Sequence, residues 1–238
     1  SINLKQKLLL NTMCGRYALA PSPKQKSEQL RDVQQPVTWK IRYNIAPTQS
    51  AYIIGNDHPE RIREMTWGLV HSWSRDGLNS GKLINARAES IFEKPSFREI
   101  IQTRRCLVPA DSFYEWRKEP DGRKLPYRIL LKNGALMFMA GIWDEWGSGS
   151  NVRTTFSIIT TGPNEEMAAL HNRMPLILAS AEAQVAWLSD LSVEKITPML
   201  QPPANGLLRM YRVSERLNGT SYDAPELQDE VPDVLRLF

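Results

Sequence analysis

The chemistry open to Cys14 depends on its place in the chain, directly after Met13 and before Gly15, Arg16 and Tyr17. If the preceding residues were removed, Cys14 would carry a free α-amine and a thiol on adjacent carbons. Together these groups can trap an aldehyde as a thiazolidine ring. An α-amine has a pKa of about 7.7–8.0, against about 10.4 for lysine, so far more of it is nucleophilic at neutral pH. The alternative is that Cys14 is a small buried apolar residue.

Three polar side chains recur at alternate positions further along the chain, Asn85, Arg87 and Glu89. In an extended segment these side chains would share one face. An amide can hold a hydroxyl group or a developing oxyanion, and a guanidinium can bind phosphate through two hydrogen bonds. The alternative is an edge strand with a solvated polar face.

Glu115 lies between two aromatic residues, Tyr114 and Trp116. Desolvation by these neighbours would raise the pKa of the carboxyl group and suit it to proton transfer. The alternative is a partly exposed carboxylate on a strand. Asp111, in the same stretch, is interpreted as a turn or cap residue rather than a catalytic group.

His171 and Arg173 form a third candidate pair, followed by Met174 and Pro175. Pro175 favours an extended Met174, and in an extended segment the His171 and Arg173 side chains can point the same way. A histidine near its reference pKa can act as an acid or a base, and an arginine beside it can bind an anion.

Aromatic side chains could add base stacking to such a site. Trp73 leads into a polar loop, and stacking on an unpaired base contributes about 1–3 kcal/mol. Trp67 lies in a predicted strand and is expected to pack in the core. His71, close to Trp73, is interpreted as a surface or stacking residue, and His58 as part of a polar turn.

Composition favours one globular domain, because 238 residues with an even mix of apolar and charged types can bury a large core. The formal charge of +4 favours a polyanionic partner only mildly. The two cysteines, Cys14 and Cys106, have neither disulfide-framework nor zinc-type spacing, and they fit a reducing cytosol. No stretch has the apolar length of a membrane span, and residues 1–13 lack the core and cleavage site of a targeting peptide.

Strand-like segments dominate the chain and do not alternate regularly with helices, which predicts a mixed, strand-rich α+β domain. The expected strands are 51–55, 61–68, 106–116, 126–131, 136–146, 154–160, 174–178 and 207–213, and the expected helices are 22–33, 96–103, 163–170, 181–188 and 193–200.

The order and spacing of several short motifs, between Cys14 and Val213, resemble the SRAP family of SOS-response-associated peptidases or abasic-site-processing proteins. The motifs are MCGRY at 13–17, YNIAPT at 43–48, WGL at 67–69, INARAE at 84–89, CLVPA at 106–110 with YEW at 114–116, AGIW at 140–143 and HNRMP at 171–175. The implied fold is a single compact strand-rich α+β domain with a mixed sheet and short peripheral helices.

The resemblance implies covalent capture of abasic sites in single-stranded DNA. The open-chain deoxyribose aldehyde would condense with the Cys14 amine to an imine, and the thiol would close a thiazolidine. Asn85 would position the amine or the sugar, Glu115 would shuttle protons, and His171 would assist opening of the sugar ring and closure of the new one.

The resemblance also implies a DNA-binding surface, no metal, no organic cofactor and no membrane partner. The protein is expected to be a cytoplasmic, nucleoid-associated monomer. The residues implied to contact or shape the DNA groove are Arg16, Arg87, Arg173, Trp67, Trp73 and Asn44.

One departure from the family pattern affects Cys14. Family members usually begin Met-Cys, whereas here residues 1–13 precede the cysteine. These residues are expected to be an extension or propeptide before a single domain at 14–238, and Cys14 could release them by attacking the Met13 carbonyl. Two other functions stay open: a thiol peptidase using Cys14, His171 and Glu115, and a non-covalent single-stranded DNA-binding module.

Overall fold

The computed structural model describes residues 14–77 and 83–232, which form two β-sheets with short helices around them. The expected extension at 1–13 lies outside the described residues. The first sheet has the strand order β12-β8-β7-β1-β2. Its strands are β1 (Tyr17–Leu19), β2 (Arg42–Ile45), β7 (Ser112–Lys118), β8 (Lys124–Leu131) and β12 (Leu208–Arg212).

The second sheet closes on itself, because β9 pairs with both β6 and β10. The order β10-β4-β3-β6-β9 therefore forms a five-stranded barrel, and β5 and β11 pair with β10 at its end. Its strands are β3 (Ser50–Gly55), β4 (Arg63–Trp67), β5 (Asn85–Arg87), β6 (Arg105–Ala110), β9 (Met137–Trp146), β10 (Arg153–Thr161) and β11 (Met174–Pro175).

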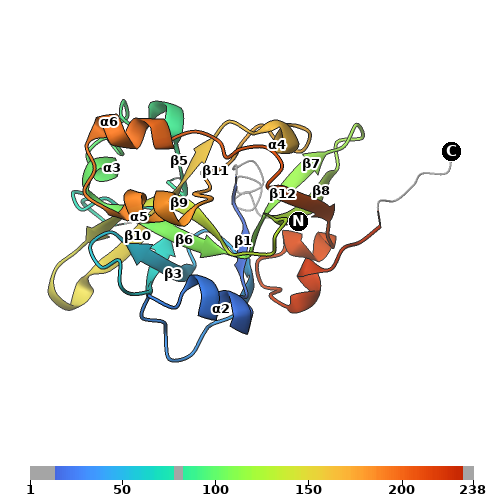
Figure 1. Ribbon diagram of the computed structural model, residues 1–238, viewed down its shortest axis with the longest axis horizontal. Coiled ribbons are helices and arrows are strands. Elements are labelled where there is room, and N and C mark those ends of the chain that lie inside the picture. Colours follow the sequence, from blue (N-terminus) through green and yellow to red (C-terminus); the bar gives the residue numbers. More distant parts are fainter. Residues whose placement is uncertain (1–13, 78–82, 233–238) are drawn as a thin grey trace.

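The helices are short and lie around the sheets, as expected (Figure 1). They are α2 (Pro23–Gln29), α3 (Ile100–Thr103), α4 (Glu165–Ala168), α5 (Ala181–Leu188) and α6 (Val193–Ile196), with the 3-10 turns η1 (Ala88–Ser90), η2 (Gly149–Asn151), η3 (Thr197–Met199), η4 (Glu215–Asn218) and η5 (Pro225–Gln228). None of the helices in the described parts of the chain is long and apolar enough to cross a membrane. The expectation of a strand-rich α+β domain is confirmed.

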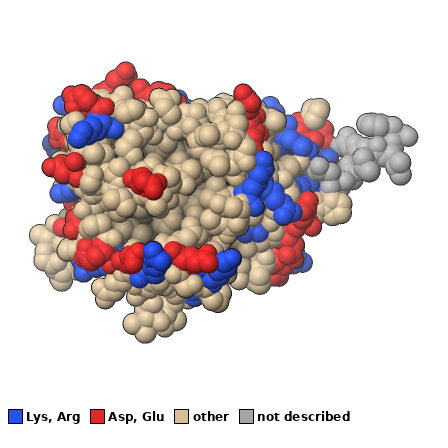
Figure 2. Space-filling model, in the orientation of Figure 1, with Lys and Arg blue, Asp and Glu red and all other residues tan. Residues whose placement is uncertain are grey.

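Charged side chains are spread unevenly over the face seen in Figure 2. The middle of this face is almost uncharged, and Lys, Arg, Asp and Glu gather around its rim. A polyanion would therefore find little attraction in the centre of this face, so the modest positive charge of the chain does not by itself locate a binding surface.

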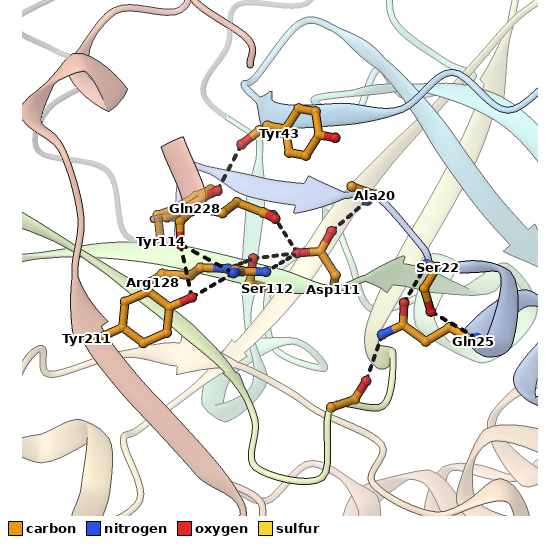
Figure 3. Close-up of polar contacts among 11 residues, drawn as sticks. Ala20, Ser22, Gln25, Tyr43, Asp111, Ser112, Tyr114, Arg128, Tyr211 and Gln228 are labelled. Carbon is orange, nitrogen blue, oxygen red and sulfur yellow. Dashed lines mark hydrogen bonds and ion pairs between the residues drawn. The ribbon is translucent and has the colours of Figure 1, made fainter. Parts of the chain in front are cut away.

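The segment 106–116 was expected to be one strand, and this is wrong. It divides at Asp111 into β6 of the barrel and β7 of the first sheet. The Asp111 carboxylate accepts hydrogen bonds from the Ala20 backbone (2.6 Å), the Arg128 guanidinium (3.0 Å) and the Gln228 amide (2.8 Å), as Figure 3 shows. Asp111 thus holds the corner between the two sheets, in agreement with its interpretation as a turn residue.

A large hydrophobic core fills the barrel and continues between the sheets, with Trp67, Phe113 and Phe156 among its fully buried side chains. A smaller cluster lies under the C-terminal segment and contains Ala18, Tyr114, Val213, Leu217 and Leu227. Because removal of apolar surface from water is the main stabilising contribution, this cluster fixes the C-terminal segment against β1 and β7.

Candidate active site

Pairing of β1 with β7 brings Cys14 beside Glu115. The strands are antiparallel, with Tyr17 opposite Phe113, and the Cys14 backbone N–H donates a hydrogen bond of 2.5 Å to Oε1 of Glu115. Cys14 and Glu115 are only 2 % and 3 % exposed. Cys14 also has a φ of 45°, a left-handed conformation that is uncommon for a residue with a side chain and is often held in place at functional sites.

His171 lies near the same oxygen of the Glu115 carboxylate. Its Nδ1 is 3.8 Å from Oε1 of Glu115, and its backbone N–H donates to the Met167 carbonyl at the end of α4. The His171 side chain is 25 % exposed, so it connects the buried pair with solvent. The structure therefore brings Cys14, Glu115 and His171 together, with the carboxylate in the middle.

Burial sets the protonation states of the first two residues. It raises the pKa of Glu115, and the nearby His171 and the hydrogen bond from Cys14 partly oppose this shift. Burial also raises the pKa of the Cys14 thiol well above its usual value, the Glu115 charge adds to the rise, and Arg173 partly offsets it. The thiol is thus protonated at neutral pH and has a proton acceptor in contact.

This arrangement favours chemistry at the Cys14 nitrogen over chemistry of a preformed thiolate. Cysteine hydrolases need a thiolate, which a neighbouring cation or helix N-terminus stabilises. Here a carboxylate lies in contact with Cys14 and disfavours the thiolate. The same carboxylate can accept or donate a proton at the nitrogen.

Asn85 and Arg87 lie on β5, which pairs in parallel with β10 so that Arg87 is opposite Thr160. Pro175 of β11 pairs with Thr160 from the other side, which places β5 and the segment after His171 around the same strand end. Asn85 is half-buried and Arg87 is exposed. Glu89 was expected to continue the strand, but it lies in the 3-10 turn η1.

Arg173 was expected to grip a phosphate, but its guanidinium is already engaged. It donates to both carboxylate oxygens of Glu89, at 2.5 and 3.0 Å, and to the Thr160 carbonyl at 2.6 Å. Its side chain is 12 % exposed. The sequence placed Glu89 in the polar series but gave no signal that it pairs with Arg173, 84 residues away.

Arg16 and Asn44 form a buried network rather than an open binding surface. One Arg16 nitrogen donates to the Asn44 side chain and to the Leu217 carbonyl, both at 2.7 Å. The Asn44 amide donates to the carbonyls of Gly219 and Tyr222. Asn44 is 0 % exposed, so in this structure its side chain is engaged within the fold and is not presented to solvent.

Arg16 nevertheless contributes charge close to Cys14. Burial lowers its pKa to about 10, which leaves it protonated at neutral pH. Within residues 14–77 and 83–232, no carboxylate forms an ion pair with it. No carboxylate in the described residues therefore neutralises its positive charge directly, although only 8 % of the residue is exposed.

The two tryptophans expected near DNA differ in accessibility. Trp67 is fully buried between Tyr17 and Phe156, and its indole N–H donates to the Ile84 carbonyl, so it can shape a groove only by supporting it from within. Trp73 is 69 % exposed and stacks on the His71 ring at 4.6 Å between centroids. His71 is a stacking residue, as expected, but it is buried rather than at the surface.

In the parts of the chain that the structure describes, no group of three His, Cys, Asp or Glu side chains could hold a metal ion.

Comparison with known proteins gives a consistent result. The family model described as SOS response associated peptidase (SRAP) matches residues 13–220. The abasic site processing protein YoqW of Bacillus subtilis (strain 168) is 38% identical over 221 residues, covering 90% of this chain and 98% of that protein. The abasic site processing protein HMCES of Gallus gallus is 29% identical, covering 90% and 76%. A crystal structure of a Bacteroides thetaiotaomicron protein matches with a TM-score of 0.80 and 31% identity, covering 92% of this chain and all of that one.

Proposed function

Because the chain belongs to the SOS response associated peptidase (SRAP) family, we propose that it processes abasic sites in DNA by covalent capture through an N-terminal Cys14. Relatives that cover most of the chain are named abasic site processing proteins. The observation that carries the mechanism is the 2.5 Å contact between the Cys14 nitrogen and Oε1 of Glu115, with Nδ1 of His171 at 3.8 Å from the same oxygen. This contact supports the proposal, because a group able to carry a proton lies against the atom that would become the nucleophile.

The proposed capture reaction needs no oxidant, reductant or other co-reactant. The free amine of Cys14 adds to the aldehyde carbon of the ring-opened deoxyribose, and loss of one water gives an imine. The thiol sulfur then adds to the same carbon, its proton passes to Glu115, and the ring nitrogen takes up a proton. His171 exchanges protons with solvent and assists opening of the sugar ring.

Exposed side chains would hold the DNA. Arg87 and Trp73 are exposed and suit a phosphate and an unpaired base, respectively. Asn85, beside Arg87 on β5, would orient the sugar or the amine. Arg16 adds positive charge from beneath the surface.

The test is an incubation of protein prepared to begin at Cys14 with single-stranded DNA that carries one abasic site. We expect an adduct that survives denaturation, and no adduct with a tetrahydrofuran analogue, which has no aldehyde. Cys14→Ser keeps the amine but should give an imine that persists only after borohydride reduction. Absence of any adduct from the unsubstituted protein would refute the proposal.

A second activity of the same centre is release of residues 1–13. The Cys14 thiol would add to the Met13 carbonyl, and Glu115, in contact with the leaving nitrogen, would protonate it, which gives a thioester between Met13 and the Cys14 sulfur. Water would then hydrolyse this thioester, releasing residues 1–13 with a carboxylate end and leaving Cys14 with a free amine and a free thiol. Intact-mass measurement over time should show loss of residues 1–13 from the unsubstituted chain but not from Cys14→Ala; equal retention in both would refute self-cleavage.

A general thiol peptidase fits the site less well, because the buried thiol beside a carboxylate resists ionisation. Purely non-covalent binding to single strands predicts steep salt dependence and indifference to the abasic site. The tetrahydrofuran comparison separates that function from covalent capture.

A further inference from the structure

Arg173 connects two segments around the candidate active site. Its guanidinium makes a two-pronged ion pair with Glu89 of η1 and two further hydrogen bonds to Thr160, at 2.6 Å to the carbonyl and 3.1 Å to the hydroxyl. Glu89 also accepts a hydrogen bond from the Gly162 backbone, at 3.2 Å. These contacts fix the Arg173 side chain to the end of β10, with 12 % of it exposed.

The backbone of Arg173 in turn holds His171. Both its N–H and its carbonyl oxygen lie 3.2 Å from Nδ1 of His171. When the imidazole is neutral, Nδ1 can accept the Arg173 N–H, which places the ring proton on Nε2. When the ring is protonated, the Nδ1–H can donate to the Arg173 carbonyl. The Arg173 backbone can therefore form a hydrogen bond with both the neutral and the protonated His171 ring. The proposed reaction requires this ring to gain and lose a proton.

We propose that Glu89 is a positioning residue for His171 and acts through Arg173. Glu89 and Thr160 fix the Arg173 side chain, and the fixed residue presents its backbone to Nδ1 at a set distance. The ring is thereby kept 3.8 Å from Glu115 while it gains and loses a proton. This inference rests on the proposed function, because it gives Glu89 a part in the proton transfers of abasic-site capture.

The contacts also distinguish this role from phosphate binding by Arg173. A guanidinium in a two-pronged pair with a carboxylate has little net charge to offer an approaching phosphate. If Glu89 only shielded a phosphate-binding arginine, its removal would strengthen DNA binding. If Glu89 positions His171, its removal slows the reaction and leaves binding unchanged.

The experiment compares Glu89→Gln with Glu93→Gln, which removes the same charge from an exposed residue nearby. For protein beginning at Cys14, we expect Glu89→Gln to lower the rate of adduct formation at saturating DNA about tenfold or more, since small misplacements of a catalytic group are costly. Affinity for the tetrahydrofuran analogue should not change. Glu89→Asp should recover part of the rate, and Glu93→Gln should behave as the unsubstituted protein.

A second readout does not depend on activity. Nitrogen-15 NMR of the His171 ring in the free protein should show the Nε2–H tautomer when the ring is neutral, and a mixture of tautomers in Glu89→Gln. An unchanged rate and tautomer in Glu89→Gln would overturn the inference, as would tighter DNA binding with a salt slope steeper by about one. If the unsubstituted protein forms no adduct while the tautomer still shifts, only the proposed function fails.

Discussion

Glu115 combines a position that suits proton transfer with a cost in stability. The carboxyl group is 3 % exposed, and its buried contacts are the Cys14 backbone N–H and the imidazole of His171. Burial raises its pKa, so the ionised form is held in the folded state at a free-energy cost. A group that a reaction needs is often less stable in place than a neutral isostere would be.

Glu115→Gln should therefore stabilise the fold while it impairs capture. Because the folded-state pKa lies above the unfolded value of about 4.3, the carboxyl group's stabilising contribution is complete below that value and is lost as pH rises through the folded pKa. Gln can still accept the Cys14 N–H. We expect Glu115→Gln to gain about 1–2 kcal/mol in the free energy of unfolding at pH 7.5, and much less at pH 4.

Urea denaturation at both pH values checks this expectation. Glu93→Gln, at an exposed position, should show no such pH-dependent difference. Equal stability of Glu115→Gln and the unsubstituted protein at pH 7.5 would contradict the inferred cost of the buried carboxylate.

At the scale of elements, the C-terminal segment supports the strands that carry the site. Leu227 of η5 is fully buried in the small cluster with Ala18 of β1 and Tyr114 of β7. The Leu217 carbonyl accepts a hydrogen bond from the guanidinium of Arg16, and Arg16 is two residues from Cys14 in the sequence. Asp223 accepts hydrogen bonds from Arg42 and, at 2.6 Å, from the Tyr43 backbone of β2.

Leu227→Ala should destabilise the protein although residue 227 lies beyond the 13–220 region that the family model matches. Deleting a buried leucine side chain typically costs about 2–5 kcal/mol. Chemical denaturation checks the value, with Val185→Ala as the control, because Val185 is 71 % exposed. A cost below about 0.5 kcal/mol for Leu227→Ala would show that the C-terminal segment is not part of the cooperative fold.

Sequence patterns located most of these elements but not their partners. The expected helix 181–188 matches α5, and most strands are within a few residues of their predicted ends, because apolar alternation is a local property. The division at Asp111 was missed because both halves form strands, and tertiary contacts of Asp111 with Ala20, Arg128 and Gln228 hold the corner there.

The same limit applied to the candidate site. Glu115 and His171 were singled out by residue type and neighbours, and the fold brings them together. Arg173 and Asn44 were expected at DNA, but Glu89 and the C-terminal carbonyls engage them. The residue type shows that a side chain can bind phosphate. It does not show that a carboxylate or carbonyl distant in the sequence already occupies that side chain in the folded protein.

At the scale of the whole molecule, the candidate site lies where the two sheets meet. The first sheet provides Glu115 from β7 and, just before β1, Cys14. The barrel provides His171 and Arg173 through the pairing of β11 with β10, and Asn85 through β5. The proposed chemistry draws on residues from both sheets, so it depends on the relative position of the sheets, to which the Asp111 contacts contribute.

The central claim is that the nitrogen of Cys14, freed as an amine, is the nucleophile. The most direct test compares two chains that differ only at the start, one beginning at Cys14 and one in which Met13 is retained, each incubated with single-stranded DNA containing an abasic site. Intact-mass analysis, which also shows whether Met13 is still attached, should show protein plus DNA minus one water for the first chain and no adduct on protein that keeps Met13. Equal adduct formation by both chains would contradict the account, because a blocked Cys14 cannot form a thiazolidine.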